Sequence, residues 1–204
     1  MDDHLTFNDE LHSRIRKANN ISGIIRRTFT YLDEETFKKL FKALVRPHLE
    51  YAATVWKPRL KRDIAKLESV QRRATKYIPT LRNLPYEERL KKLGLPTIRF
   101  RHLRGDLIET FKIMTSKYDF HSSSLFYRAE NSNTRGHHLK LLKPRTTTAT
   151  RTNFFAIRTI NDWNSLPASI IESPTTITFK NRLDRHWKNH PLLYKFDRDA
   201  HETQ

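Results

Sequence analysis

A segment between Leu60 and Ile78 places lysine and arginine side chains about one helical turn apart. On a helical wheel with 3.6 residues per turn, its basic and apolar residues lie on different arcs. The basic arc consists of Arg62, Lys66, Arg73 and Lys76, and Arg72 adjoins it in the sequence. The apolar arc consists of Ile64, Leu67, Val70, Ala74, Tyr77 and Ile78. Because cations at this spacing can follow the phosphates of a nucleic-acid backbone, the segment predicts a helix with a core face and a phosphate-binding face.

The alternative interpretation of this pattern is a solvated helix face, since most runs of charge are simply exposed to water. A solvated face usually mixes the two signs of charge, whereas residues 57–104 contain fifteen lysines and arginines and only four acids. They hold most of the formal net charge of +17. Such an imbalance favours an anionic partner, either nucleic acid, a membrane surface or an acidic protein. Aromatic residues spread through the basic parts favour nucleic acid.

A second basic segment lies further along the chain and has no acid between Arg135 and Arg158. Its candidate contacts with nucleic acid are Arg135, Lys140, Lys143, Arg145 and Arg151. A stretch of this composition cannot collapse by itself, so it predicts a flexible linker that is extended in the absence of a polyanion.

No group of residues has the spacing of a complete active site. Asp2 and Asp3 superficially resemble the paired aspartates that hold two metal ions in polymerases, but no strand precedes them. His186 and His190 at the end of a helix are typical of polar surface. The chain has no cysteine, which excludes disulfides, thiolate nucleophiles and zinc sites built on cysteine. We therefore expect no catalytic residue, no metal site and no cofactor.

Helical periodicity and few glycines predict a mainly α-helical fold. The expected signals, in chain order, are Asn8 and Asp33 as N-caps, Pro47 as a kink, Pro85 as a helix start, Gly94 as a stop and Thr97 as another N-cap. The expected parts are a leading segment 1–8, a helical domain 9–118, the basic linker 119–152, a C-terminal helical segment 153–190 and a disordered tail 191–204. The first helix should cover residues 9–29, and the last should cover 176–188.

Neither the composition nor the start of the sequence indicates a membrane protein. No run approaches the eighteen or so apolar residues of a membrane span, and residues 1–4 are acidic where a signal peptide would be basic. We expect an intracellular protein, nuclear or cytoplasmic, without a membrane partner.

Several phrases of the sequence, in this order, resemble one protein family. They are Leu44–Ala52, Leu67–Thr75, Tyr86–Leu90, Thr134–His137 and Asn161–Pro167. Together they are similar to the C-terminal part of the reverse transcriptase encoded by non-LTR (LINE-type) retrotransposons of the endonuclease and reverse transcriptase class. The resemblance covers nearly the whole chain. No single phrase is specific, but the ordered set is.

The resemblance implies a fold and a set of partners. The helices after residue 8 would be a thumb-like bundle that grips the template and primer, and residues 1–8 would be the remnant of the connection from the palm. The metal-binding aspartates of that family belong to the palm, upstream of the matching region, so no polymerase activity is expected of this chain alone. The implied partners are RNA and RNA–DNA hybrid, with a polymerase palm acting in cis or in trans.

Two other interpretations remain open at this stage. The chain could be a helical interaction protein that binds acidic partners, for which exposed apolar groove residues would be expected more than a cationic stripe. It could also be a non-functional remnant or a fragment of an element.

Overall fold

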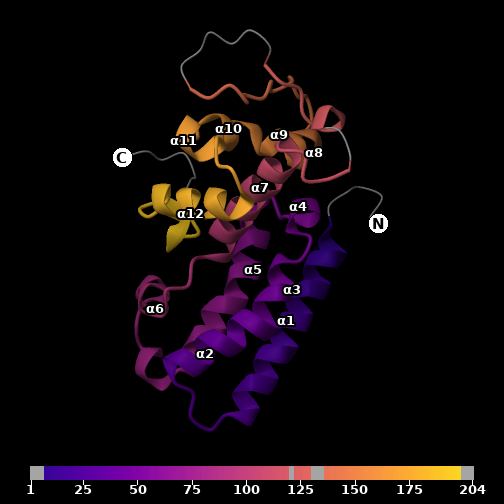
Figure 1. The fold of residues 1–204 in the computed structure, drawn as a ribbon. Helices are drawn as coiled ribbons and strands as arrows, with labels where there is room; N and C mark the ends of the chain where they lie inside the picture. The colour runs from indigo at the N-terminus through magenta and orange to yellow at the C-terminus, as the bar shows by residue number, and fades with distance from the viewer. Residues whose placement is uncertain (1–6, 120–121, 130–135, 199–204) are drawn as a thin grey trace. The chain divides into compact units, whose positions relative to one another are not determined.

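The structure is a computed structural model, which describes residues 7–119, 122–129 and 136–198 (Figure 1). The described chain is mainly helical, as the sequence predicts, and its one β-bridge pairs Arg128 with Leu141. It forms two compact units. The first holds the described residues up to His102 and those from His190 onward, and the second holds the residues from Leu103 to Asn189. The division falls inside one long helix, away from the domain boundaries expected at residues 118 and 152.

The first unit begins with α1 (Asn8–Thr28), which carries acids in its first turn and Arg26 and Arg27 in its last. This arrangement complements the helix dipole. The prediction that Asn8 caps the helix is wrong, because Phe7 occupies the N-cap position. Phe7 has the left-handed backbone conformation (φ 54°), and its carbonyl accepts the first helical hydrogen bond, from Leu11 N, at 2.9 Å.

A nearly continuous helical segment follows, made of α2 (Glu34–Leu40), a π-helical turn (Phe41–Val45) and α3 (Arg46–Glu50). Asp33 caps α2 as predicted, since its carboxylate accepts from the amides of Glu35 and Thr36, each at 2.9 Å. Pro47 cannot donate a backbone hydrogen bond, and its ring needs room in the preceding turn. The wider π-turn accommodates it, with Arg46 N bonded to Phe41 O.

A short α4 (Ala53–Trp56) leads to α5 (Lys61–Ala74), the helix with the basic stripe. A 3₁₀ turn (Thr75–Tyr77) extends α5, and the chain becomes extended at Ile78. The predicted end at Ile78 was therefore slightly too late. Pro79 follows, and the residue before a proline avoids helical backbone angles. Both α3 and α5 pack against α1, with Leu49, Leu67, Val70 and Ala74 in the core of this unit (Figure 1).

The helix end predicted at Gly94 and the helix start predicted at Thr97 are both confirmed. Helix α6 (Tyr86–Leu93) ends at Gly94, whose positive φ of 59° suits a residue without a side chain. Helix α7 (Ile98–Met114) begins at Thr97, whose hydroxyl accepts from Phe100 N at 3.1 Å. The same hydroxyl donates to Leu192 O at 2.6 Å. Residues 191–193 form a 3₁₀ turn in which Leu192 is buried, which differs from the disordered tail expected from residue 191 onward.

The second unit is built around Trp163 and Phe179, both fully buried. Phe111 of α7 stacks on Phe179 with ring centroids 4.3 Å apart. Residues 149–171 of this unit form several short helices. They are α8 (Ala149–Thr152), α9 (Phe155–Arg158), α10 (Ile160–Asn164) and α11 (Ala168–Ile171), and they are followed by the longer α12 (Thr176–His186).

Part of the expected linker is held by the C-terminal helices. Leu141 is buried, its amide donates to Asn164 Oδ1 at 2.9 Å, and its carbonyl accepts from Asn164 Nδ2 at 2.8 Å. Trp163 Nε1 donates to Leu139 O at 2.8 Å. Composition could not reveal these bonds, because they depend on residues more than twenty positions away.

Burial of His137 should make this docked segment sensitive to acid. His137 is 3% exposed and its Nε2 lies 3.2 Å from Trp163 O. Burial lowers the pKa of His137 below 6.5, and the hydrogen bond to Trp163 O only partly opposes this effect. Nearby Lys140 and His138 lower the pKa further, and Glu172 opposes them weakly. The free energy of unfolding should therefore fall as the pH drops below 6.5, since the unfolded chain takes up a proton that the folded imidazole resists.

The comparison that checks this prediction is wild type against His137→Gln, with unfolding followed by urea titration between pH 7.5 and pH 5. The wild type should lose more stability over this range than the variant. Equal losses in the two proteins would show that His137 contributes nothing to the acid sensitivity.

Candidate nucleic-acid interface

Helix α5 presents its basic stripe to solvent because the opposite face is committed to the core. Leu67, Val70 and Ala74 are at most 2% exposed. The five candidate residues on α5 and the turn after it are all exposed: Arg62, Lys66, Arg72, Arg73 and Lys76. The arrangement predicted from the periodicity is therefore present in the structure.

Two of these cations, Arg62 and Lys66, lie beside the same acid, Asp63. A count of charges in the sequence could not show this pairing. Asp63 is 5% exposed, and its carboxylate lies 3.1 Å from Lys66 Nζ and 3.8 Å from Arg62 Nε. The N-terminal end of the stripe is thus partly neutralised. Its C-terminal end carries the less compensated charge.

The arginines at that end are oriented by neutral groups. Arg73 Nη2 donates to Asn19 Oδ1 of α1 at 3.1 Å. The Arg72 guanidinium lies over two aromatic rings, 5.2 Å from the centroid of Tyr86 and 4.9 Å from that of Phe196. Stacking of this kind positions a guanidinium without neutralising it. Both arginines are therefore held at a defined place by groups that carry no charge.

Not every cation between residues 57 and 104 is available to a ligand. Arg89 is 2% exposed and donates to Thr75 Oγ1 at 3.0 Å, Leu84 O at 2.6 Å and Arg72 O at 3.2 Å. It fixes α6 to the end of α5. The excess of charge counted from the sequence therefore overstates the charge on the surface.

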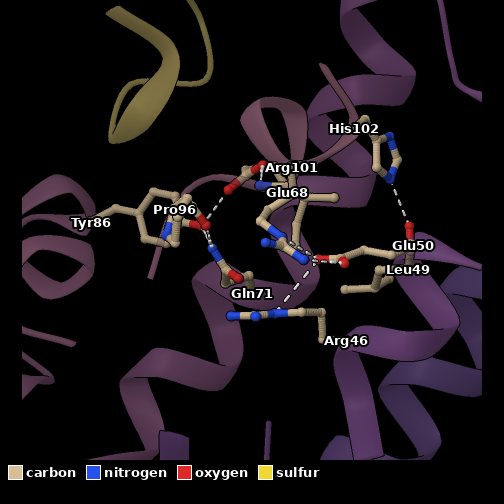
Figure 2. A network of polar contacts seen from close by, with 10 residues as sticks. Arg46, Leu49, Glu50, Glu68, Gln71, Tyr86, Pro96, Arg101 and His102 are labelled. Atoms are coloured by element: carbon tan, nitrogen blue, oxygen red, sulfur yellow. Dashed lines mark hydrogen bonds and ion pairs between the residues drawn. The ribbon is translucent and has the colours of Figure 1, made fainter. Parts of the chain in front are cut away.

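A buried polar cluster, consisting of Glu68, Gln71 and Tyr86, holds the inner side of α5 in place (Figure 2). Glu68 is 1% exposed and accepts from Tyr86 Oη at 2.5 Å and from the amide of Ile98 at 2.9 Å. Gln71 Nε2 donates to Tyr86 Oη at 3.1 Å and to Pro96 O at 3.0 Å. The carboxyl of Glu68 thus ties α5 to the first turn of α7.

Burial raises the pKa of Glu68 to about 7, although the hydrogen bonds from Tyr86 and Ile98 favour the carboxylate. In the sequence, Glu68 is only one of the four acids between residues 57 and 104, so this cluster was not predicted. Gln71 could have indicated the cluster, because it is a polar residue on the apolar side of the predicted helix. It follows Val70 directly and precedes Ala74 by three positions.

The second group of candidate residues lies in the second unit. Lys143, Arg145 and Arg151 are exposed, and the Arg151 guanidinium lies 5.6 Å from the ring centroid of Phe154. Lys140 is half-buried, with its aliphatic chain beside Gly136. Arg135 lies outside the described residues. These side chains come from irregular segments and the short α8, so no regular spacing relates them.

Side chains that bind metal ions are not grouped together in the described residues. No group of three or more histidine, aspartate or glutamate side chains there could hold a metal ion. His137 is buried by Trp163, and Asp2 and Asp3 lie outside the described part of the chain. Within the same residues, none of the helices is long and apolar enough to cross a membrane.

Comparisons of the chain with protein-family models, with curated proteins and with solved structures gave no match.

Proposed function

We propose that this chain binds nucleic acid through phosphate contacts along α5, as the thumb portion of a non-LTR reverse transcriptase that grips the template and primer. The observation that supports the proposal is the row of exposed cations from Arg62 to Lys76 on a helix whose other face buries Leu67, Val70 and Ala74. The ordered phrases of the sequence resemble that family, and the resemblance implies RNA and RNA–DNA hybrid as the partners. A polymerase palm, in cis or in trans, would carry the chemistry.

The contacts differ in their expected strength. Arg73 and Lys76 should contribute most, because Asn19 orients Arg73 without neutralising it and because Lys76 is exposed at the less compensated end. Lys66 should contribute less, because Asp63 already pairs with it. Contacts from Lys140, Lys143, Arg145 and Arg151 are secondary, as are those from Arg135. Since phosphate contacts position a duplex and read no bases, binding should depend strongly on salt and weakly on sequence.

The double substitution Arg73→Gln and Lys76→Gln tests the proposal. It should weaken binding to an RNA–DNA hybrid and make the slope of log K against log salt less steep by about two units, about one for each lost phosphate contact. Fluorescence anisotropy with a labelled hybrid, at four or more salt concentrations, measures both quantities.

A matched control removes the same charges elsewhere on the first unit. Arg16 of α1 and Lys39 of α2 are exposed, and Lys39 already pairs with Glu35 at 2.8 Å. The double substitution Arg16→Gln and Lys39→Gln should change the slope much less. Equal effects of the two double variants would mean that only net charge matters, which would refute a defined interface on α5.

A further inference from the structure

A second group of cations gathers around the π-helical turn Phe41–Val45, away from the residues predicted from the sequence. Lys42 lies in the turn and is exposed, and Arg46 follows it four residues later. Arg101, from the first turns of α7, reaches the same place (Figure 2). Turns of π-helix in the middle of α-helices occur often at functional sites.

The carboxylate of Glu50 faces both arginines. It accepts two hydrogen bonds from Arg101, from Nε at 2.9 Å and from Nη2 at 2.8 Å. Arg46 Nε lies 3.6 Å from Glu50 Oε1, beyond hydrogen-bonding distance. Arg46 Nε and Nη2 are buried, and neither has a hydrogen-bond partner in the described residues. Arg101 therefore takes the carboxylate, and Arg46 is left with an incompletely matched charge.

The energetic consequence is an excess of positive charge around the Arg46 side chain, which is 13% exposed. Burial lowers the pKa of Arg46, and the nearby Arg101 lowers it further against the opposing charge of Glu50. The pKa of Lys42 is also lowered, first by burial and then by Arg46, Lys38 and Arg101. Unmatched buried donors and crowded like charges both cost stability. An anion at this place would relieve both costs.

We propose that Lys42 and Arg46, with Arg101 beside them, bind a phosphate group. Arginine and lysine are the usual ligands of phosphate, whose oxygens can accept several charged hydrogen bonds at once. To bind the anion, the Arg46 guanidinium would turn away from Glu50 toward the surface. Glu50 would remain paired with Arg101 after this movement. The identification of the phosphate as part of a nucleic-acid backbone rests on the proposed function, whereas the site itself does not.

Inorganic phosphate is the probe for the site itself. The melting temperature of the wild-type chain should rise when sodium phosphate replaces sodium chloride at constant ionic strength and pH, because a ligand that binds the folded state stabilises it. The rise should disappear in the double variant Lys42→Gln and Arg46→Gln. It should persist in the control Arg16→Gln and Lys39→Gln.

Loss of Arg46 leaves Glu50 paired with Arg101, so the double variant should fold. Lys42→Gln alone, at an exposed position, should still reduce the rise if the double variant proves too unstable to measure. Absence of the rise in the wild type, or its full persistence in these variants, would overturn the proposal.

Binding of an RNA–DNA hybrid distinguishes this proposal from that for α5. If the phosphates of the hybrid occupy the site, Lys42→Gln with Arg46→Gln should make the salt slope less steep by up to two units. If the site takes only free phosphate, the slope should stay the same while the phosphate-dependent rise is lost. The α5 variant Arg73→Gln and Lys76→Gln should keep that rise in either case, so each proposal can fail without the other.

Discussion

Asp106→Asn should lower the free energy of unfolding by about 3–5 kcal/mol, the usual cost of leaving a buried charge without its partner. Asp106 is 2% exposed and accepts from Arg158 Nη2 at 2.9 Å and from Arg158 Nε at 3.1 Å. This pair joins α7 to α9 within the second unit. The asparagine side chain has nearly the same shape but removes the negative charge that faces Arg158.

The matched control is Asp184→Asn. It also removes one negative charge, from the ion pair that Asp184 forms with Arg104 of α7. Asp184 accepts two hydrogen bonds from Arg104, at 2.5 and 2.7 Å, but its side chain is 49% exposed. Because water screens this pair, its loss should cost less than about 1 kcal/mol despite the shorter distances. Urea titrations at 25 °C measure both variants. Similar losses in the two would contradict the expectation that burial decides the effect.

Glu68→Gln should change how stability depends on pH. The folded pKa of Glu68 is about 7 and its ordinary value is 4.5, so the folded chain holds a proton in this interval that the unfolded chain has released. This group therefore makes wild-type stability fall as the pH rises from 4.5 to 7. Glutamine does not titrate. Relative to wild type, the variant should gain about 3 kcal/mol between pH 4.5 and pH 8.

Urea titrations of both proteins at several pH values give this difference directly, and the other titrating groups cancel in it. A difference that does not change with pH would show that Glu68 titrates normally in the folded chain. Glu87→Gln is a useful control, because the lysines beside Glu87 lower its pKa. That variant should therefore show no gain relative to wild type in the same interval.

The sequence predicted those features of the fold that depend on neighbouring residues. The caps at Asp33 and Thr97 and the stop at Gly94 are local, because each is set by bonds within a few positions. The basic face of α5 followed from the 3.6-residue period alone. The end of the same helix before Pro79 could also have been predicted from the proline rule.

The features that the sequence did not predict depend on contacts between distant segments. Glu68 bonds to an amide thirty residues away, and Arg101 bonds to a carboxylate fifty-one residues away. A count of charges cannot separate Arg89, which is buried, from Arg73, which is exposed. The site around Arg46 was missed for the same reason, since its excess charge arises only when α7 brings Arg101 to Glu50.

The most direct test of the central proposal is equilibrium binding of the purified chain to an RNA–DNA hybrid over a range of salt concentrations. Single-stranded RNA and an acidic protein serve as comparators. We expect binding to the hybrid with a log–log salt slope near −4, which corresponds to about four or five phosphates. The five candidate residues on α5 and the turn after it are enough for this number. No binding to nucleic acid at low salt, in a sample shown by circular dichroism to be helical and folded, would contradict the proposal.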